Sequence, residues 1–386
     1  MRELAIVIVA YNRVHSLKRL LKSIAQAEYD RKDIPLIISV DRGEQNIDVV
    51  RIAEDFDWEY GSKKVVYQQE NLGLKQHILQ CGDYTKEYGS IIMLEDDLYV
   101  SPAFYLYARK ALDFTEQMDQ IAGVSLYNHL FNVHTREPFS ALEDGFSNWY
   151  MQFASSWGQA WTCEQWLKFK SWLLSRENDE QFDDPRIPHN VASWSDHSWL
   201  KYFIKYMIEN DLYFLYPRIS LTTNFFDEGQ HAKKAVTDLQ VPLAGRKQRA
   251  YHFSSLEQSE AVYDAFFENS KLEQKMKEFL QTEELCVIDL YGYKTQKSRY
   301  LLSGACKPYQ VLARFGCRLR PMDANIYEET EGDYFFLYDT SVQGKKPKKA
   351  DVDQYLYHYR ALKSKYMVKL LFYRIKEAIS IQKSNQ

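Results

Sequence analysis

Short apolar runs alternate with helical patterns through the first 130 residues, and this alternation restricts the fold more than any other feature. The apolar runs cover residues 4–10, 36–40, 64–67 and 90–94 and are predicted to be buried strands. Between them, apolar residues recur three and four positions apart, as in residues 17–24, which is typical of amphipathic helices. Ser16 is expected to cap that helix, and Ser101-Pro102 to open a later one. The pattern predicts an α/β fold with a mostly parallel sheet and helices on both faces.

Size and composition limit the classes of protein to consider. With 386 residues, the chain has room for about two domains. Its hydrophobic content of 45% is that of a globular protein, and a net charge of −4 argues against nucleic acid as a partner. Five cysteines without a CxxC pair favour a reducing, cytoplasmic compartment. No apolar window is long enough to cross a membrane, so we expect a soluble or peripheral protein.

The pattern also suggests where the domains divide. Residues 1–250 are expected to form the main domain, with a first part at 1–130 and a second part at 131–250. Residues 251–386 are expected to form a smaller α+β extension that ends in a basic amphipathic helix. That helix could lie on an anionic membrane surface at the inner face of the cell membrane, or pack against its own domain or a second subunit.

Polar residues follow three of the predicted strands. They are Asn12-Arg13, Asp41-Arg42 and Glu95-Asp96-Asp97. Because the carboxyl ends of parallel strands meet at one edge of a sheet, these side chains are expected to converge there. Three adjacent carboxylates repel one another unless a cation offsets their charge, and oxygen ligands of this kind suit Mg²⁺ or Mn²⁺. A solvated acidic turn is the alternative interpretation.

Four segments carry a resemblance to a known family. They read IVIVAYNRVHSLKRLLKSI, IISVDRG, NLGLKQHILQ and IIMLEDDLYVSPAFYLY. In this order and spacing they resemble the donor-binding half of a GT-A fold glycosyltransferase, a Rossmann-like fold that binds nucleotide-diphospho-sugars. The chain is similar to the N-acetylglucosaminyltransferase I type and to the bacterial family-2 glycosyltransferases, over about residues 4–235.

The resemblance implies that residues 1–130 bind the nucleotide-sugar and that residues 131–250 form the acceptor part. It also implies roles for single residues in these segments. Asp97 would be the metal ligand, while Glu95 and Asp96 would face the sugar and the ribose. Arg13 would contact the diphosphate, and Asp41 would recognise the uracil or ribose. The remaining residues implied to bind the nucleotide-sugar in these segments are Ala10, Tyr11, Asn12 and His77. His77 could equally be a histidine on a helix face whose hydrogen bonds are satisfied within the protein.

Three further residues come from later segments. SSWGQAWT resembles the loop that lines the sugar and acceptor pocket, which gives Trp161 a binding role. ASWSDHSWLKY resembles the segment of the catalytic base, but Ser195 stands where the family has a first acid, so Asp196 becomes the candidate base. TTNFFDEGQHA resembles a closing loop in which His231 would approach the diphosphate. Five tryptophans could stack on sugar rings: Trp149, Trp157, Trp161, Trp194 and Trp199.

Together these assignments imply a metal-dependent, inverting glycosyltransferase that uses Mn²⁺ or Mg²⁺. It would move a hexosyl or N-acetylhexosaminyl group from a nucleotide-sugar, with UDP-sugars such as UDP-GlcNAc favoured. The acceptor would be a saccharide or a lipid-linked saccharide, in the assembly of a bacterial surface polysaccharide or glycan. A sugar nucleotidyltransferase is disfavoured because residues 10–21 lack glycine, and a non-catalytic saccharide-binding protein stays an alternative.

Overall fold

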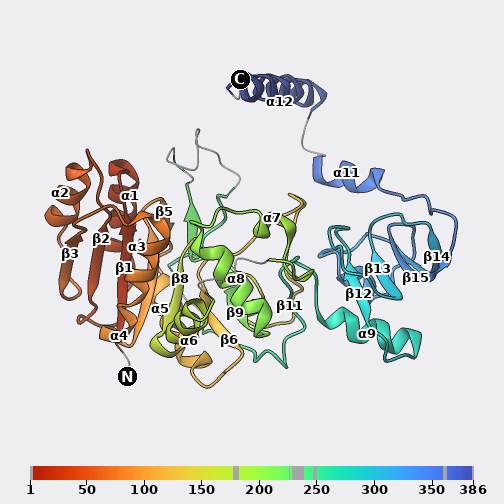
Figure 1. Cartoon of the computed structure of the whole chain (residues 1–386), viewed down its shortest axis with the longest axis horizontal. Helices are drawn as coiled ribbons and strands as arrows, with labels where there is room; N and C mark the ends of the chain where they lie inside the picture. The colour runs from red at the N-terminus through yellow and green to blue at the C-terminus, as the bar shows by residue number, and fades with distance from the viewer. Residues whose placement is uncertain are drawn as a thin grey trace. The chain divides into compact units, whose positions relative to one another are not determined.

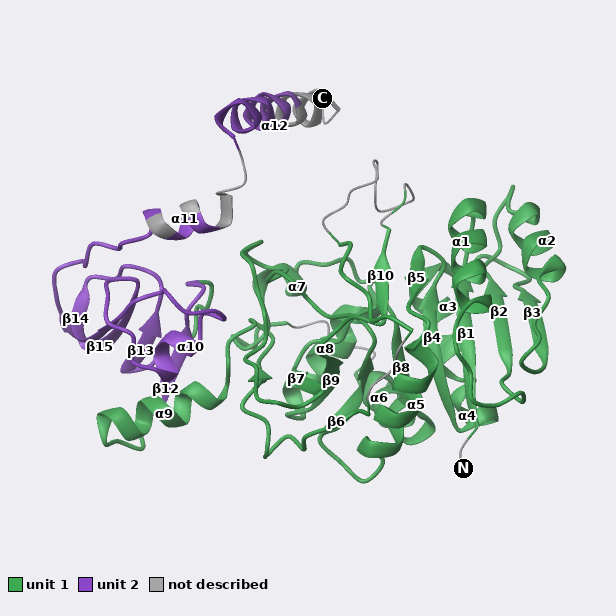
Figure 2. Ribbon diagram, turned by 180° about the vertical axis from the view of Figure 1, so that it is seen from behind, with its two compact units in different colours: residues 1–283, 293–297 green, residues 284–292, 298–386 purple. Residues whose placement is uncertain are grey.

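The chain forms two compact units in the computed structural model (Figure 1, Figure 2). The structure describes residues 3–176, 182–225, 227, 239–246, 250–359 and 363–384. Unit 1 comprises residues 1–283 and 293–297, and unit 2 comprises residues 284–292 and 298–386.

The first half of unit 1 alternates strands with helices as predicted. Its elements are β1 (Leu4–Ala10), α1 (Val14–Ala25), β2 (Leu36–Val40), α2 (Ile47–Asp55), β3 (Lys63–Tyr67), α3 (Gly73–Gly82), α4 (Thr85–Tyr88) and β4 (Ser90–Glu95). β1 pairs in parallel with both β2 and β4, and β2 pairs in parallel with β3. The parallel arrangement brings the carboxyl ends of β1, β2 and β4 to one edge of the sheet.

The second half of unit 1 extends the same sheet. Its elements are β5 (Leu98–Val100), α5 (Phe104–Thr115), β6 (Ile121–Ser125), β7 (Asn148–Met151), β8 (Gln159–Thr162), α6 (Cys163–Leu174), α7 (His189–Ala192), α8 (Trp199–Glu209), β9 (Tyr213–Pro217), β10 (Thr222–Asn224), β11 (Val262–Tyr263) and α9 (Lys271–Leu280). The resulting nine-stranded sheet has the order β11-β7-β9-β6-β8-β4-β1-β2-β3. β8 runs antiparallel to both of its neighbours, β4 and β6. β5 and β10 form a separate antiparallel pair.

Helices cover both faces of this sheet, which confirms the predicted α/β class. Side chains of α1, α2 and α5 share one buried cluster with alternate residues of the strands, such as Ile6 and Ile8 of β1. Because successive strand residues point to opposite faces, the intervening residues of β1 serve the other face, where α3 contacts β1, β4 and α8. Burial on both faces explains why these strands are apolar throughout rather than alternating.

Two predicted helix starts are wrong. α1 begins at Val14, two residues before the expected cap, because the Ser16 hydroxyl hydrogen-bonds the carboxylate of Asp227 at 2.6 Å. α5 begins at Phe104 rather than at Ser101-Pro102. The hydroxyl of Ser101 accepts from the backbone N–H of Ala103 at 3.1 Å and donates to the carbonyl of Ala244. Both serine hydroxyls therefore donate to partners that are distant in the sequence.

Unit 2 contains a four-stranded sheet with the order β12-β13-β15-β14. Its elements are β12 (Cys286–Asp289), β13 (Tyr300–Ser303), β14 (Tyr309–Phe315), α10 (Ala324–Tyr327), β15 (Phe335–Gln343), α11 (Val352–Tyr359) and α12 (Ser364–Ser384). Unit 1 extends to Glu283, beyond the boundary expected at residue 250, because β11 adds to the main sheet through β7. Among the residues described, no helix is both long and apolar enough to span a bilayer.

Candidate functional site

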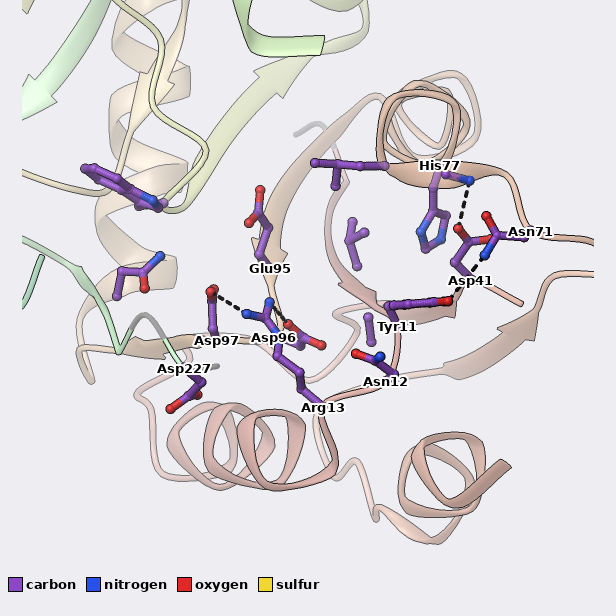
Figure 3. Close-up of a pocket in the computed structure, with 16 residues that line it drawn as sticks. Tyr11, Asn12, Arg13, Asp41, Asn71, His77, Glu95, Asp96, Asp97 and Asp227 are labelled. Atoms are coloured by element: carbon purple, nitrogen blue, oxygen red, sulfur yellow. Dashed lines mark hydrogen bonds and ion pairs between the residues drawn. The ribbon is translucent and has the colours of Figure 1, made fainter. Parts of the chain in front are cut away.

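A cavity of about 220 Å³ lies at the carboxyl ends of β1, β2 and β4, where the polar residues were predicted to converge (Figure 3). It is lined by Val9, Ala10, Tyr11, Asn12, Arg13, Asp41, Asn71, Gly73, Leu74, His77, Glu95, Asp96, Asp97, Trp157, Asn224 and Asp227. The cavity thus brings together nine of the twelve residues predicted to form the site. These are Ala10, Tyr11, Asn12, Arg13, Asp41, His77, Glu95, Asp96 and Asp97.

One end of the cavity holds the acidic triplet and a single arginine. β4 ends at Glu95, and the backbone N–H of Asp96 donates to the carbonyl of Val9, which turns the chain over the end of β1. Arg13 Nη1 donates to Asp97 Oδ2 at 2.9 Å, and the same guanidinium forms an ion pair with Asp96. Figure 3 shows the guanidinium between these two carboxylates.

Each of these two aspartates keeps one oxygen free of hydrogen bonds. Asp96 Oδ2 and Asp97 Oδ1 are buried, and neither has a hydrogen-bond partner in the part of the chain that the structure describes. A buried carboxylate oxygen without a partner costs free energy, so such atoms usually meet a ligand or an ion. We call the group of Arg13, Glu95, Asp96 and Asp97 the acidic end of the cavity.

Ionisation of the three carboxyl groups at the acidic end is unfavourable, and their pKa values are raised. Burial, together with the neighbouring charge of Asp97, raises the pKa of Glu95 to about 8. Burial also raises the pKa of Asp96 to about 6 and that of Asp97 above its ordinary value, although Arg13 opposes both shifts. One guanidinium is therefore too little positive charge for three carboxylates, and an additional cation would be stabilised here.

The acidic end fits a divalent metal held jointly with a substrate. Asp97 Oδ1 and Asp96 Oδ2 offer hard oxygen ligands that hydrogen-bond to no group in the described ranges. The described residues contain no group of three or more side chains that could hold a metal without such a partner. Mg²⁺ and Mn²⁺ are commonly bound in this way, with substrate phosphates completing the coordination.

The opposite end of the cavity is organised around Asp41, which follows β2. Asp41 Oδ1 accepts hydrogen bonds from the backbone N–H groups of Arg42 and Leu72, both at 2.9 Å. Its Oδ2 accepts from the N–H of Gly73 at 3.0 Å. The carboxylate therefore fixes the first turn of α3 to the end of β2. We call the region around Asp41 the hydrogen-bonded end of the cavity.

His77 lies on α3 beside Asp41 and is a neutral imidazole at pH 7. Its Nε2 lies 2.7 Å from the hydroxyl of Ser39, and burial lowers the pKa of His77 to about 4 despite the nearby charge of Asp41. The ring both lines the cavity and forms a buried hydrogen bond, so the two interpretations of this histidine are compatible.

Asn46 connects this end to the first strand. Its Nδ2 donates to the carbonyls of Tyr11 and Asp41 at 2.7 and 2.8 Å. Its Oδ1 accepts from the hydroxyl of Tyr67 at 2.9 Å. These bonds hold the loops after β1 and β2 together, and with them the position of the Tyr11 ring at the cavity wall.

Three predicted site residues do not line the cavity or lie outside the described residues. Trp161 is fully buried and packs against Trp166 and Trp199 rather than facing the cavity. Asp196 is exposed and pairs with Lys201 at 2.9 Å. His231 is outside the residues that the structure describes. Of the five tryptophans considered for sugar stacking, Trp157 is the one that lines the cavity.

Asp227 was missed by the sequence analysis. It lines the cavity, accepts from the Ser16 hydroxyl at 2.6 Å and forms an ion pair with Arg19. Burial opposes its ionisation, but the hydrogen bonds from Arg19 and Ser16 outweigh burial and lower the pKa of Asp227. The sequence shows an acidic residue at this place in the FFDEGQHA segment. Its partners lie more than two hundred positions earlier, so the sequence alone does not predict the contact.

Comparisons with known proteins give a family match and several similar solved structures. Residues 5–153 match the family model described as glycosyl transferase family 2. Two similar solved structures are a mannosyltransferase from Pyrobaculum calidifontis in complex with GDP-Man and Mn²⁺, and residues 1–349 of TarS from S. aureus in complex with UDP-GlcNAc. The first is 14% identical with a TM-score of 0.31 over 46% of this chain and 47% of that one. The second is 13% identical with a TM-score of 0.38 over 59% of this chain and 60% of that one.

The chain therefore matches about half to three fifths of the length of those two structures. No curated protein sequence matches it. The family match spans β1 to β7 and includes nearly every residue of the cavity. Residues 5–153 are accordingly similar to a family-2 glycosyltransferase domain, and their α/β fold agrees with the expected GT-A class.

Proposed function

We propose that this protein transfers a hexosyl or N-acetylhexosaminyl group from a UDP-sugar to a saccharide hydroxyl, with inversion at the anomeric carbon and with a divalent metal. The observation that carries the proposal is a pair of buried oxygens beside Arg13, one on Asp96 and one on Asp97, which have no hydrogen-bond partner in the part of the chain that is described. A cavity that holds surplus acid and one arginine suits an anionic diphosphate only when a cation accompanies it.

The acidic end is suited to the departure of a nucleoside diphosphate. Asp97, with Asp96 beside it, would hold Mn²⁺ or Mg²⁺, which as a Lewis acid stabilises the negative charge of the leaving diphosphate. Arg13 is already fixed between the two carboxylates and can donate to a phosphate oxygen without reorganising. Both groups would act most strongly on the charge that develops as the glycosidic bond breaks.

The hydrogen-bonded end favours uracil over guanine. A carboxylate has about four acceptor positions, and the backbone already occupies three of those of Asp41. One position remains on Oδ2, enough for the single N3–H of uracil. Guanine presents two adjacent donors, N1–H and N2–H, which require both oxygens of a carboxylate. A UDP-sugar is therefore the favoured donor.

Asp196 is the proposed general base. Lys75 Nζ donates to the backbone carbonyl of Asp196 at 3.2 Å, and Lys75 directly follows Leu74 of the cavity wall. The hydrogen bond and the charge of Lys201 lower the pKa of Asp196, so its carboxylate is ionised at neutral pH and able to accept a proton. An acceptor hydroxyl that enters over α3 would pass this carboxylate before it reaches the sugar.

The proposal is tested by measuring sugar transfer and UDP release by the full chain, with UDP-, GDP- and CMP-sugars and with or without Mn²⁺. We expect turnover with a UDP-sugar that depends on Mn²⁺ and falls about 10²–10³-fold in Asp97→Asn. Asp196→Asn should lower kcat by about 10²–10⁴-fold while KM for the donor stays close to the wild-type value. NMR of the product reports the anomeric configuration.

Asp119→Asn is the matched control, because Asp119 is an exposed carboxylate that pairs with a lysine outside the cavity. It should leave activity unchanged. Metal-dependent turnover that survives in Asp97→Asn would disprove the metal site, and full turnover in Asp196→Asn would place the base elsewhere. Binding of UDP-sugars without transfer to any saccharide acceptor would favour a non-catalytic saccharide-binding protein.

A further inference from the structure

The C-terminal helix α12 exposes an apolar stripe. Every described side chain from Ser364 to Lys376 is exposed. Val368, Leu371, Phe372 and Ile375 lie at spacings of three and four, and 46–62% of the surface of each is accessible. We call these four residues the tail stripe. Apolar side chains that are grouped on one side of a helix and exposed to this degree usually contact another molecule.

Basic side chains border the tail stripe on both sides. Lys365, Lys369 and Lys376 share one face of the helix next to the stripe, since they are four and seven positions apart. Arg374 lies on the other border. Residues 363–376 contain five basic residues and no acidic residue, although the whole chain has a net charge of −4.

The segment before the helix is basic as well. Residues 345–349 read KKPKK, and Lys345, Lys346 and Lys348 are exposed. Positive charge is thus concentrated in the part of unit 2 that follows β15, and it accompanies the exposed apolar side chains of α12.

This combination fits an anionic lipid surface better than a second copy of the chain. Pairing two α12 helices through their tail stripes would bring two sets of bordering cations together without an acid between residues 363 and 376 to offset them. An anionic bilayer offsets the cations with its headgroups and accepts the stripe among its acyl chains. No described helix could cross the bilayer, so the contact would be parallel to its surface.

We propose that α12 binds anionic membrane surfaces, with the tail stripe inserted below the headgroups and Lys365, Lys369, Lys376 and Arg374 among the lipid phosphates. This binding is independent of the glycosyl transfer proposed above. It would hold the protein at a surface where lipid-linked saccharides are displayed.

The test is co-sedimentation of the full chain with vesicles of phosphatidylcholine alone and of phosphatidylcholine mixed with phosphatidylglycerol. We expect binding only to the anionic vesicles, and weaker binding as salt is added, because salt screens the attraction. The triple variant Lys365→Glu, Lys369→Glu, Lys376→Glu should bind about 100-fold more weakly or not at all. The control triple variant Lys22→Glu, Lys32→Glu, Lys297→Glu changes the net charge equally at exposed lysines of unit 1 and should bind as wild type does.

A second pair of variants tests the stripe itself. Leu371→Ser with Phe372→Ser removes two stripe residues, whereas Leu370→Ser with Tyr373→Ser removes similar apolar area from the same helix outside the stripe. The first variant should lose most of the binding to anionic vesicles, and the second should retain it.

Three results would overturn the proposal. They are no sedimentation of wild-type protein with anionic vesicles, equal sedimentation with both kinds of vesicle, and binding that both triple variants retain. Analytical ultracentrifugation in the absence of lipid completes the test. If the wild-type protein does not bind vesicles but forms a dimer, and the dimer dissociates in the Leu371→Ser, Phe372→Ser variant, the tail stripe contacts a second copy of the chain instead.

Discussion

At the hydrogen-bonded end of the cavity, Asp41 accepts hydrogen bonds from three backbone N–H groups. At the acidic end, Asp96 and Asp97 each keep a buried oxygen without a hydrogen-bond partner among the described residues. Aspartate side chains at the two ends of one cavity therefore contribute differently to the stability of the empty protein. Asp41 stabilises the empty protein, whereas the acidic end is offset by Arg13 alone and a further cation would stabilise it. In the proposed function, the part of the cavity that recognises the base would be built in during folding, while the part that binds the diphosphate would depend on ligands.

The largest difference between the two ends should appear on replacing Asp97. Asp97→Asn removes one charge from a crowded acidic group, so we expect the melting temperature of the metal-free protein to stay within a few degrees of wild type while activity falls about 10²–10³-fold. Thermal shift with and without Mn²⁺ checks the same point, because the rise in melting temperature that Mn²⁺ causes in wild type should disappear. A large loss of stability without metal would contradict the proposed difference between the ends.

The hydrogen-bonded end predicts a pH dependence of stability through His77. The pKa of His77 in the folded protein is lowered from 6.5 to about 4, so its contribution is complete above pH 6.5 and is lost as the pH falls towards 4. Relative to His77→Gln, the wild-type free energy of unfolding should fall by up to about 3 kcal/mol over this range. Urea unfolding of both proteins at several pH values measures this change in the free energy of unfolding. His252→Gln, at an exposed histidine, is the control, and parallel curves for wild type and His77→Gln would refute the prediction.

Replacing Asp41 should lower stability even without ligand. In Asp41→Asn an NH₂ group takes the place of one oxygen and faces a backbone N–H, so at least one hydrogen bond is lost and a donor meets a donor. We expect the free energy of unfolding to fall by about 2–3 kcal/mol, together with a higher KM for the UDP-sugar. An Asp41→Asn protein as stable as wild type would show that the two ends do not differ as proposed.

The smallest effect should come from Tyr67→Phe. This change removes the hydroxyl that donates to Asn46 Oδ1 and leaves the aromatic ring under the Arg42 guanidinium, 4.4 Å from its centroid. Loss of one partly buried hydrogen bond should cost about 1 kcal/mol in denaturant unfolding with little change in kcat. A large fall in kcat would show that the loop held by Asn46 contributes to the chemical step.

The parts of the molecule that follow from local sequence were predictable. β1 and β2 have the predicted bounds, because an apolar, β-branched run determines a doubly covered strand by itself. Parallel pairing then places Arg13, Asp41 and Asp97 at one edge of the sheet, so the principal charged residues of the cavity could be found from their positions after the strands.

The parts that depend on distant contacts were not predictable from the sequence. The antiparallel insertion of β8 and the addition of β11 depend on which strand edges are free after the first half has folded. Trp161 and Trp157 look equivalent in SSWGQAWT, yet the first lies in β8 and is covered on both faces while the second precedes the strand and reaches the cavity. Asp227 becomes part of the site through Ser16 and Arg19 of α1.

The antiparallel insertion of β8 also bears on how the protein can move during turnover. Because β8 is hydrogen-bonded to β4 on one side and to β6 on the other, a single ladder runs from β3 to β11 without a break. Swinging residues 1–130 away from residues 131–250 would require rupturing that ladder. In the proposed reaction, the spent nucleotide would therefore be released through displacements of connecting segments on a rigid sheet. A covalent cross-link between the two parts across β4 and β8 should therefore leave the catalytic cycle running.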